Sequence, residues 1–522
     1  MSLARSFLTV GSATMASRVL GFVREMMIAM LLGTGPVADA FYAAFRFPNL
    51  FRRLFAEGAF NSAFVPLFAK ELEGGGREAA QAFAEQVLGV FLVTLVVLTA
   101  LAEIFMPALV ASVVAPGFDA QSGKYQLTVE LTRIVFPYLM FMALVAMLSG
   151  VLNSFRRYAV AALAPVLLNI VMIAVLAGCY FAGLGDSPQT GRWMAWGVCF
   201  SGLAQLGLLV WAIRQLGFSF LPRRPRLTPA VRRLLVLAVP AALAGGITQI
   251  NLLVGQIIAS QKAGAIAILQ YADRVYQLPL GVVGIAVGVV LLPELARRLK
   301  AGDWQAARDT ENQSLEFSLA LTLPAAAGLA ALAGPIVALL YERGAFSAAD
   351  SLATSNALMA FCIGLPAFVL IKVFSPGYFA REDTRTPMIF AGVGAVVNVI
   401  GSLLLFPVYA HVGIAIATAI AGWINAILLL SGLMRRGHWI WQPGLVRRLV
   451  MMAVAALAMG AGLVMAGQLA GDWVLSANLV VQALYVAAMI ALGAGFYFAL
   501  VHLTGAFDLR VARARLRRPQ SD

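Results

Sequence analysis

Polar and cationic residues recur at helical spacing in an otherwise apolar segment near the N-terminus. Residues three, four and seven positions apart share one face of an α-helix, and this spacing joins Thr14, Ser17, Arg18, Gly21, Arg24 and Glu25. One interpretation is a helix that lies flat in the membrane interface. The length of segment 7–32 and the central position of its charges favour a helix whose polar face lines a cavity within the membrane.

Two other apolar segments also carry charged residues. Segment 37–68 contains Asp39 and Arg52, and segment 265–293 contains Arg274 beside Asp273. Simple solvation near the outer end of a helix is an alternative for Asp39, and Asp273 can be a structural partner. An arginine at the bilayer centre costs roughly 2.5–3.5 kcal/mol on insertion scales. Binding is therefore the better explanation for arginines in these segments.

These cations share one chemistry. If the three segments enclose one cavity, it collects Arg18, Arg24, Arg52 and Arg274, with Ser17 and Asp39 as further candidate substrate-binding residues. Guanidinium groups bind phosphate oxygens in a bidentate manner, and a low dielectric strengthens that contact. The pattern therefore predicts an anionic substrate that bears phosphate, whereas a cation exporter would need carboxylates at these positions.

Composition indicates which elements position these residues. The chain has 522 residues, of which 61% are hydrophobic and 12% charged, about half the charged fraction of a soluble domain. This excludes a soluble enzyme, a disordered chain and a disulfide scaffold, and the continuous apolar runs exclude an outer-membrane barrel. We predict an all-α, polytopic inner-membrane protein with about 14 transmembrane helices. Their limits are 7–32, 37–68, 84–107, 129–152, 159–184, 193–213, 234–260, 265–293, 315–341, 352–380, 386–409, 411–434, 449–470 and 476–504.

Positive charge predicts the orientation. If the N-terminus is cytoplasmic, 26 of the 38 Lys and Arg residues fall on that side of the membrane and four on the other. Because short cytoplasmic loops collect Lys and Arg, we predict a multi-pass membrane protein with both termini cytoplasmic. The net charge of +14 then reflects topology and contact with anionic membrane lipids, and no nucleic-acid partner is expected.

Cysteines and histidines indicate no catalytic or metal site. Cys179, Cys199 and Cys362 lie in apolar segments and are interpreted as free buried thiols. The three histidines lack metal-ligand spacing, and the chain has no P-loop and no G-x-S-x-G motif. We therefore expect a transporter without a bound cofactor, and not ATP-driven transport by this chain alone.

An internal repeat divides the chain. A shift of 227 residues places Pro66 on Pro293 and Gly150 on Gly377, and brings Asn169 within two residues of Asn398. The shift predicts two six-helix lobes around a central cavity, at 1–227 and 228–445, joined by the Pro- and Arg-rich linker 217–233. Helices 13 and 14 then occupy 446–505 and a basic cytoplasmic tail occupies 506–522. Helices 13 and 14 either line a groove for a lipid tail or serve only packing.

Several ordered motifs resemble one family. They are S-R-V-L-G-F-V-R-E at 17–25, A-D-A-F at 38–41, F-R-R-L-F-A-E-G-A-F at 51–60, F-V-P at 64–66, A-P-G-F at 115–118 and Y-A-D-R at 271–274. Over the whole chain the sequence resembles the MurJ (MviN) family of the multidrug/oligosaccharidyl-lipid/polysaccharide exporter (MOP) superfamily. The resemblance implies that lipid II, the undecaprenyl-diphosphate-linked peptidoglycan precursor, is the substrate and that the protein lies in the bacterial inner (cytoplasmic) membrane.

The resemblance also implies roles for individual residues. The family's cavity arginines fall on Arg18, Arg24 and Arg274, and Arg52 and Asp39 match functionally important positions. It assigns the lipid-tail groove to helices 13 and 14. Some relatives bind sodium through acidic residues of the second lobe, but the seventh, eleventh and twelfth segments here contain no Asp or Glu. This difference argues against sodium coupling and leaves the membrane potential as the driving force.

The resulting hypothesis is a lipid II flippase that works by alternating access. The arginines bind the diphosphate while the head group crosses the membrane, and other cell-wall synthesis proteins are candidate partners. One alternative is a flippase for another polyprenyl-linked oligosaccharide. The other is a membrane enzyme that processes polyprenyl diphosphates, for which the acidic cluster of Asp303, Glu311 and Glu316 is the nearest candidate.

Overall fold

The computed structural model describes residues 3–52, 60–470 and 478–507. Every regular element within these ranges is a helix. Nine helices in the described ranges are long and apolar enough to cross a membrane. The predicted all-α, polytopic class is confirmed, but the count of 14 spans is not. The basic tail predicted at 506–522 lies almost entirely outside the described residues.

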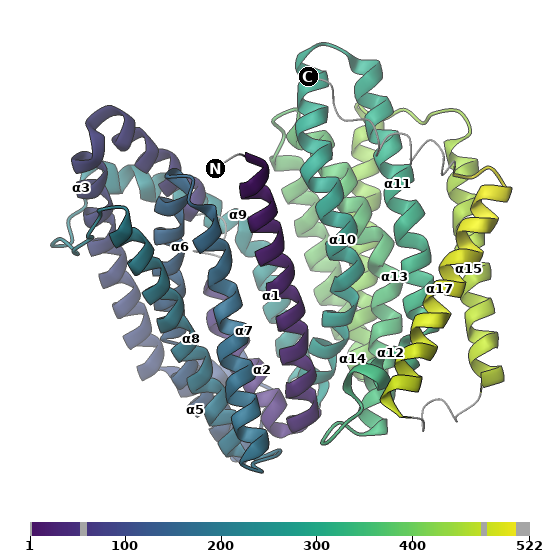
Figure 1. Cartoon of the computed structure of the whole chain (residues 1–522), viewed down its shortest axis with the longest axis horizontal. Coiled ribbons are helices and arrows are strands. Elements are labelled where there is room, and N and C mark those ends of the chain that lie inside the picture. The colour runs from purple at the N-terminus through teal and green to yellow at the C-terminus, as the bar shows by residue number, and fades with distance from the viewer. Residues whose placement is uncertain (1–2, 53–59, 471–477, 508–522) are drawn as a thin grey trace. The chain divides into compact units, whose positions relative to one another are not determined.

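The chain forms two compact units, which are described separately. The first comprises Met1–Ala267 with the short segment Arg343–Phe346, and the second comprises Ile268–Glu342 with Ser347–Asp522. The first contains α1 (Leu3–Leu32), α2 (Pro36–Arg52), α3 (Phe60–Ile104), α4 (Met106–Leu109), the π-helical turn η2 (Val110–Val114), α5 (Gly123–Val135), α6 (Tyr138–Ser154), α7 (Tyr158–Phe181), α8 (Pro188–Gln215) and α9 (Pro229–Ala259) (Figure 1).

The second unit contains the remaining helices. They are α10 (Ala265–Lys300), whose first three residues belong to the first unit, α11 (Trp304–Ala331), α12 (Ala333–Tyr341), α13 (Ala348–Phe379), α14 (Arg385–Arg435), α15 (Leu445–Ala470) and α17 (Leu479–Leu503) (Figure 1). The first compact unit includes α9, which the predicted lobe limits assign to the second lobe. Compact units and homologous halves are different properties, so the lobe limits 1–227 and 228–445 stay predictions.

Two of the long helices are interrupted at single residues. Gly76 in α3 has φ 70° and ψ −166°, and Ala410 in α14 has φ 50° and ψ −131°. A right-handed helix cannot continue through a positive φ, so each of these elements consists of two helices. The break at Ala410 lies where the sequence predicts a boundary between segments 386–409 and 411–434.

Short polar side chains set where several helices begin. The hydroxyl of Ser187 accepts a hydrogen bond from Thr190 N at the start of α8, and the hydroxyl of Thr228 accepts one from Val231 N at the start of α9. At α13, Ser347 and Asp350 form a capping box. These contacts satisfy backbone donors that have no partner within their own helix.

Each unit also contains an aromatic-rich connecting segment after a long helix, which we call a strap. The first strap is the run G-F-S-F-L-P at 217–222, which follows α8, and the second strap is G-H-W-I-W-Q-P at 437–443, which follows α14. Gly217 and Gly437 have φ of 80° and 68° and end the preceding helices. Gln81 donates to the Ser219 carbonyl at 3.1 Å, and Asn312 donates to the Ile440 carbonyl at 2.9 Å. A helix that lies earlier in each unit therefore holds the strap at its middle residue.

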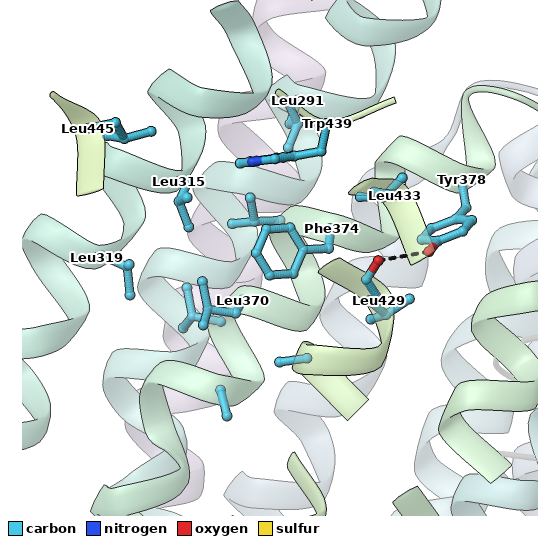
Figure 2. Close-up of a cluster of buried hydrophobic side chains, with 14 residues drawn as sticks. Leu291, Leu315, Leu319, Leu370, Phe374, Tyr378, Leu429, Leu433, Trp439 and Leu445 are labelled. Carbon is cyan, nitrogen blue, oxygen red and sulfur yellow. Dashed lines mark hydrogen bonds between the residues drawn. The ribbon is translucent and has the colours of Figure 1, made fainter. Parts of the chain in front are cut away.

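The core of the second unit lies directly beneath its strap. Trp439 is buried in a cluster with leucines of α10, α11, α13, α14 and α15 (Figure 2), and the centroid of its ring lies 5.2 Å from that of Phe374 in an edge-to-face arrangement. Tyr378 lies at the edge of this cluster and donates its hydroxyl to the Leu429 carbonyl at 2.7 Å. Aromatic burial of this kind contributes strongly to packing, so Trp439 fixes the second strap on the helices below it.

An ion pair outside the helical segments predicts a pH effect on stability. Hydrogen bonds from Thr386, and next the guanidinium of Arg436 at 2.6 Å, lower the pKa of Asp383 from 3.8 to about 2. A lowered pKa in the folded protein stabilises it at pH values above 3.8, and this contribution is lost as the pH falls toward 2. Asp383→Asn should therefore lower the midpoint of thermal unfolding slightly at pH 7. Unfolding curves from pH 7 to 2 should converge for the two proteins, and a constant difference would contradict the assignment.

Candidate functional site

The polar face of α1 packs against α7 through one buried network. Arg24 donates from one terminal nitrogen to Asn169 Oδ1 at 3.1 Å and from the other to Glu25 Oε1 at 2.9 Å. Tyr42 of α2 donates its hydroxyl to the second oxygen of Glu25 at 2.6 Å. The side chains of Arg24 and Glu25 are only 7% and 1% exposed. The network therefore holds a neutral pair in which the arginine is fixed in place.

Ser17 belongs to the same contact. Its carbonyl accepts a hydrogen bond from Asn169 Nδ2 at 2.9 Å, and its hydroxyl is 3.3 Å from the same nitrogen. Asn169 thus binds α1 at two levels, because its oxygen accepts from Arg24 about two turns further along. The sequence marks Asn169 only as a polar residue within an apolar run. Its role as the link between α1 and α7 depends on how the helices pack.

Arg18 has a different environment from Arg24. Its side chain is exposed, and it makes no hydrogen bond or ion pair with the described residues. Thr14, one turn earlier, is also exposed, and its hydroxyl bonds only to the Val10 carbonyl of its own helix. A charge on an apolar helix requires water or an anionic ligand around it. Arg18 is therefore a cation of α1 that is available to a substrate.

Asp39 is fully buried and bound by three donors. Lys124 of α5 donates to Oδ2 at 2.6 Å, and the backbone of Gly264 and Ala267 donates at 2.7 and 3.0 Å. Ala267 is the third residue of α10, so the carboxylate caps the N-terminus of that helix, where the helix dipole favours negative charge. The alternative that Asp39 is simply solvated near the outer end of a helix is wrong, because its carboxylate is buried and caps α10.

The two remaining candidates are Arg52 and Arg274. Arg52 ends α2, and its side chain lies outside the described residues. Arg274 lies on α10 within the second unit and is partly buried. Arg18 and Arg24 belong to the first unit. The convergence of the four arginines on one cavity therefore stays a prediction.

Two features of the second unit that the sequence singles out are Asn398 and the last two helices, α15 and α17. Asn398, the repeat partner of Asn169, is buried and accepts a hydrogen bond from Thr418 at 3.1 Å. Helices α15 and α17 pack against each other (Figure 1), and both expose apolar residues such as Leu457 and Leu492. Exposed leucines of this kind suit contact with lipid.

Comparison with known proteins gives one consistent result. The sequence model of the family described as "Lipid II flippase MurJ" matches residues 28–485. A curated protein of Rhizobium meliloti, named "Probable lipid II flippase MurJ", is 52% identical over 526 residues, covering 100% of this chain and 97% of its own length.

Solved structures agree with the sequence comparison. A structure titled "Lipid II flippase MurJ, inward closed conformation" superposes with a TM-score of 0.78 at 25% identity, covering 95% of this chain and 98% of the other. An inward-facing MATE family transporter of the MOP superfamily superposes with a TM-score of 0.66 at 16% identity, covering 82% of this chain and 98% of the other. The second likeness shows the fold alone.

Proposed function

The chain belongs to the MurJ family of lipid II flippases, and from this premise we propose that Arg18 and Arg24 of α1 recognise the diphosphate of lipid II. The protein is a transporter of lipid II and not an enzyme. The hypothesis of an enzyme that processes polyprenyl diphosphates is therefore dropped. The peptidoglycan role follows from the substrate.

The observation that carries the proposed site is the contrast between the two arginines of α1. Arg18 is exposed and offers its five donors to a ligand. Arg24 is held by Asn169 and Glu25, and its Nε is buried without a hydrogen-bond partner among the described residues. Arg18 makes the first contact with a phosphate. Arg24 supplies a fixed guanidinium whose unpartnered Nε–H can complete that contact.

The rest of the transport cycle follows from the proposed site. Arg274 and Arg52 join the two arginines of α1 around the diphosphate, and the two lobes then alternate in exposing the cavity to each side. Helices α15 and α17 guide the lipid tail. The membrane potential supplies about 2.3 kcal/mol per charge per 100 mV, so no cofactor and no sodium ion are needed. The protein lies in the inner membrane with both termini cytoplasmic, where other cell-wall synthesis proteins are its candidate partners.

Substitution of Arg18 tests the proposed contact. Because the side chain is exposed, Arg18→Ala should leave the unfolding midpoint unchanged while it removes a charge-assisted contact worth roughly 1.5–3 kcal/mol. The affinity of the purified protein for lipid II should fall by about ten- to a hundredfold. Arg18→Lys should retain part of it, because it keeps the charge but not the bidentate geometry.

Thr14→Ala is the matched control, since it changes an exposed residue of the same helix whose hydroxyl bonds only within that helix. Its lipid II affinity should equal that of the wild type. An Arg18→Ala protein that binds lipid II normally, or a Thr14→Ala protein that loses as much, would remove Arg18 from the site.

Depletion in the native host tests the substrate itself. Loss of the protein should trap lipid II in the cytoplasmic leaflet and stop peptidoglycan synthesis, and a wild-type copy should restore both. If lipid II still reached the outer leaflet while another polyprenyl-linked oligosaccharide was trapped, the alternative substrate would be correct.

A further inference from the structure

An apolar pocket of about 260 Å³ lies in the first unit beneath the first strap. Its walls come from α3, α6 and α8, with α6 packed against both of the other helices. Leu92, Leu144 and Leu206 represent the three helices, and Phe220 and Pro222 of the strap close one end. The pocket is smaller than the roughly 300–1,000 Å³ of a typical small-molecule site, so it suits one hydrocarbon chain better than a whole ligand.

The internal repeat identifies what occupies the same place in the second unit. The 227-residue shift maps the pocket residues Leu88, Leu92, Leu144 and Met147 onto Leu315, Leu319, Ile371 and Phe374. All four of these second-unit residues belong to, or pack against, the buried cluster around Trp439 (Figure 2). Under the predicted repeat, the two places are equivalent positions in the two halves of the chain.

The equivalent places differ in how they are filled. In the second unit Phe374 and Trp439 fill the space, and Leu445 and Leu449 of α15 pack onto the same cluster. In the first unit the 227-residue shift places Met147 where the second unit has Phe374, and Phe218 precedes the bound Ser219 carbonyl as Trp439 precedes the bound Ile440 carbonyl; a cavity remains beside them. An apolar cavity without an occupant costs packing energy. The first unit therefore has room for an apolar chain where the second unit supplies its own side chains.

Positive charge surrounds the mouth of the pocket. Arg214 is exposed and lines it directly, and the guanidinium of Arg77 lies 5.5 Å from the centroid of the Phe218 ring. The linker that follows adds Arg223, Arg224 and Arg226, of which Arg223 pairs with Glu85 at 2.8 Å. Exposed apolar residues such as Leu203 and Trp211 flank the pocket on α8. This side of the helix therefore suits membrane lipid, with cations at the level of its head groups.

We propose that the pocket binds one acyl chain of an anionic phospholipid, whose phosphate lies against Arg214 at the mouth. The apolar walls accept the chain, and the basic rim selects the head group by charge. The occupant is a membrane phospholipid that is not transported, so the site is separate from that of α1. In the first unit the acyl chain fills the space that the Trp439 side chain fills in the second unit.

Native mass spectrometry of the full-length protein with phosphatidylglycerol and with phosphatidylcholine tests this proposal. The wild-type protein should retain one phosphatidylglycerol more firmly than phosphatidylcholine. Arg214→Gln should weaken phosphatidylglycerol binding about tenfold, which corresponds to the loss of one charge-assisted contact. Leu206→Trp should displace the lipid of either kind, because the indole would occupy the chain's place. Its unfolding midpoint in detergent should equal or exceed that of the wild type, since the cavity is filled.

Arg435→Gln provides the matched control. Arg435 is also exposed and ends α14 immediately before the second strap, where the equivalent space is already filled. Its phosphatidylglycerol binding should equal that of the wild type. Equal losses in Arg214→Gln and Arg435→Gln, unchanged binding in a folded Leu206→Trp protein, or tighter retention of undecaprenyl phosphate than of phosphatidylglycerol would each overturn the proposal. Lipid II transport is a separate readout, so failure here leaves the proposed substrate site untouched.

Discussion

Arg24→Ala should abolish lipid II transport and destabilise the protein by about 3–5 kcal/mol, because it removes the guanidinium that pairs with the buried Glu25 carboxylate. The side chain of Glu25 is 1% exposed, and the hydroxyl of Tyr42 is a neutral donor that cannot replace the lost positive charge. Asn169 would also lose its contact to the arginine. Thermal unfolding of the purified protein and a leaflet assay for lipid II measure the two effects separately.

The double variant Arg24→Ala, Glu25→Ala separates stability from binding. The double variant no longer contains the buried Glu25 carboxylate that the single variant leaves without its cation, so much of the lost stability should return. Transport should remain absent, because the guanidinium proposed to contact the diphosphate is still missing. A double variant that regained transport together with stability would show that Arg24 acts only as a structural partner of Glu25.

Features that depend on local sequence could be predicted well. The limits 159–184 and 193–213 lie close to α7 and α8, and the boundary at residue 410 coincides with the interruption of α14. Hydropathy and the period of 3.6 residues depend only on neighbours in the chain. The same reasoning correctly placed the polar residues of α1 on one helix, because their spacing is local as well.

Partners that are distant in sequence could not be predicted. Asn169 lies 145 residues from Arg24, and Lys124 lies 85 residues from Asp39. No periodic pattern encodes which polar residues of two helices meet, since that depends on the rotation and depth of each helix within its bundle. A signal for Asn169 existed, because an amide within an apolar helix usually needs a partner, but the sequence does not name that partner.

Asp39→Ala should destabilise the protein by about 3–5 kcal/mol, through loss of the cap on α10 as much as loss of an ion pair. The substitution leaves the ammonium of Lys124, whose side chain is 16% exposed, without its carboxylate. It also leaves two backbone donors at the start of α10, Gly264 N and Ala267 N, without an acceptor. The unfolding midpoint in detergent measures the effect.

Lys124→Met distinguishes the cap from the ion pair. It removes the same salt bridge but leaves Asp39 with both backbone donors and the positive end of the helix dipole. Its cost should be smaller, roughly 1.5–3 kcal/mol for one charge-assisted hydrogen bond. Lipid II affinity measured on the folded fraction should stay at the wild-type level in both variants, because the Asp39 carboxylate is fully buried and binds donors of the protein itself. Equal destabilisation by the two substitutions would assign the stability to the ion pair alone, and a selective loss of affinity in Asp39→Ala would return this carboxylate to the substrate site.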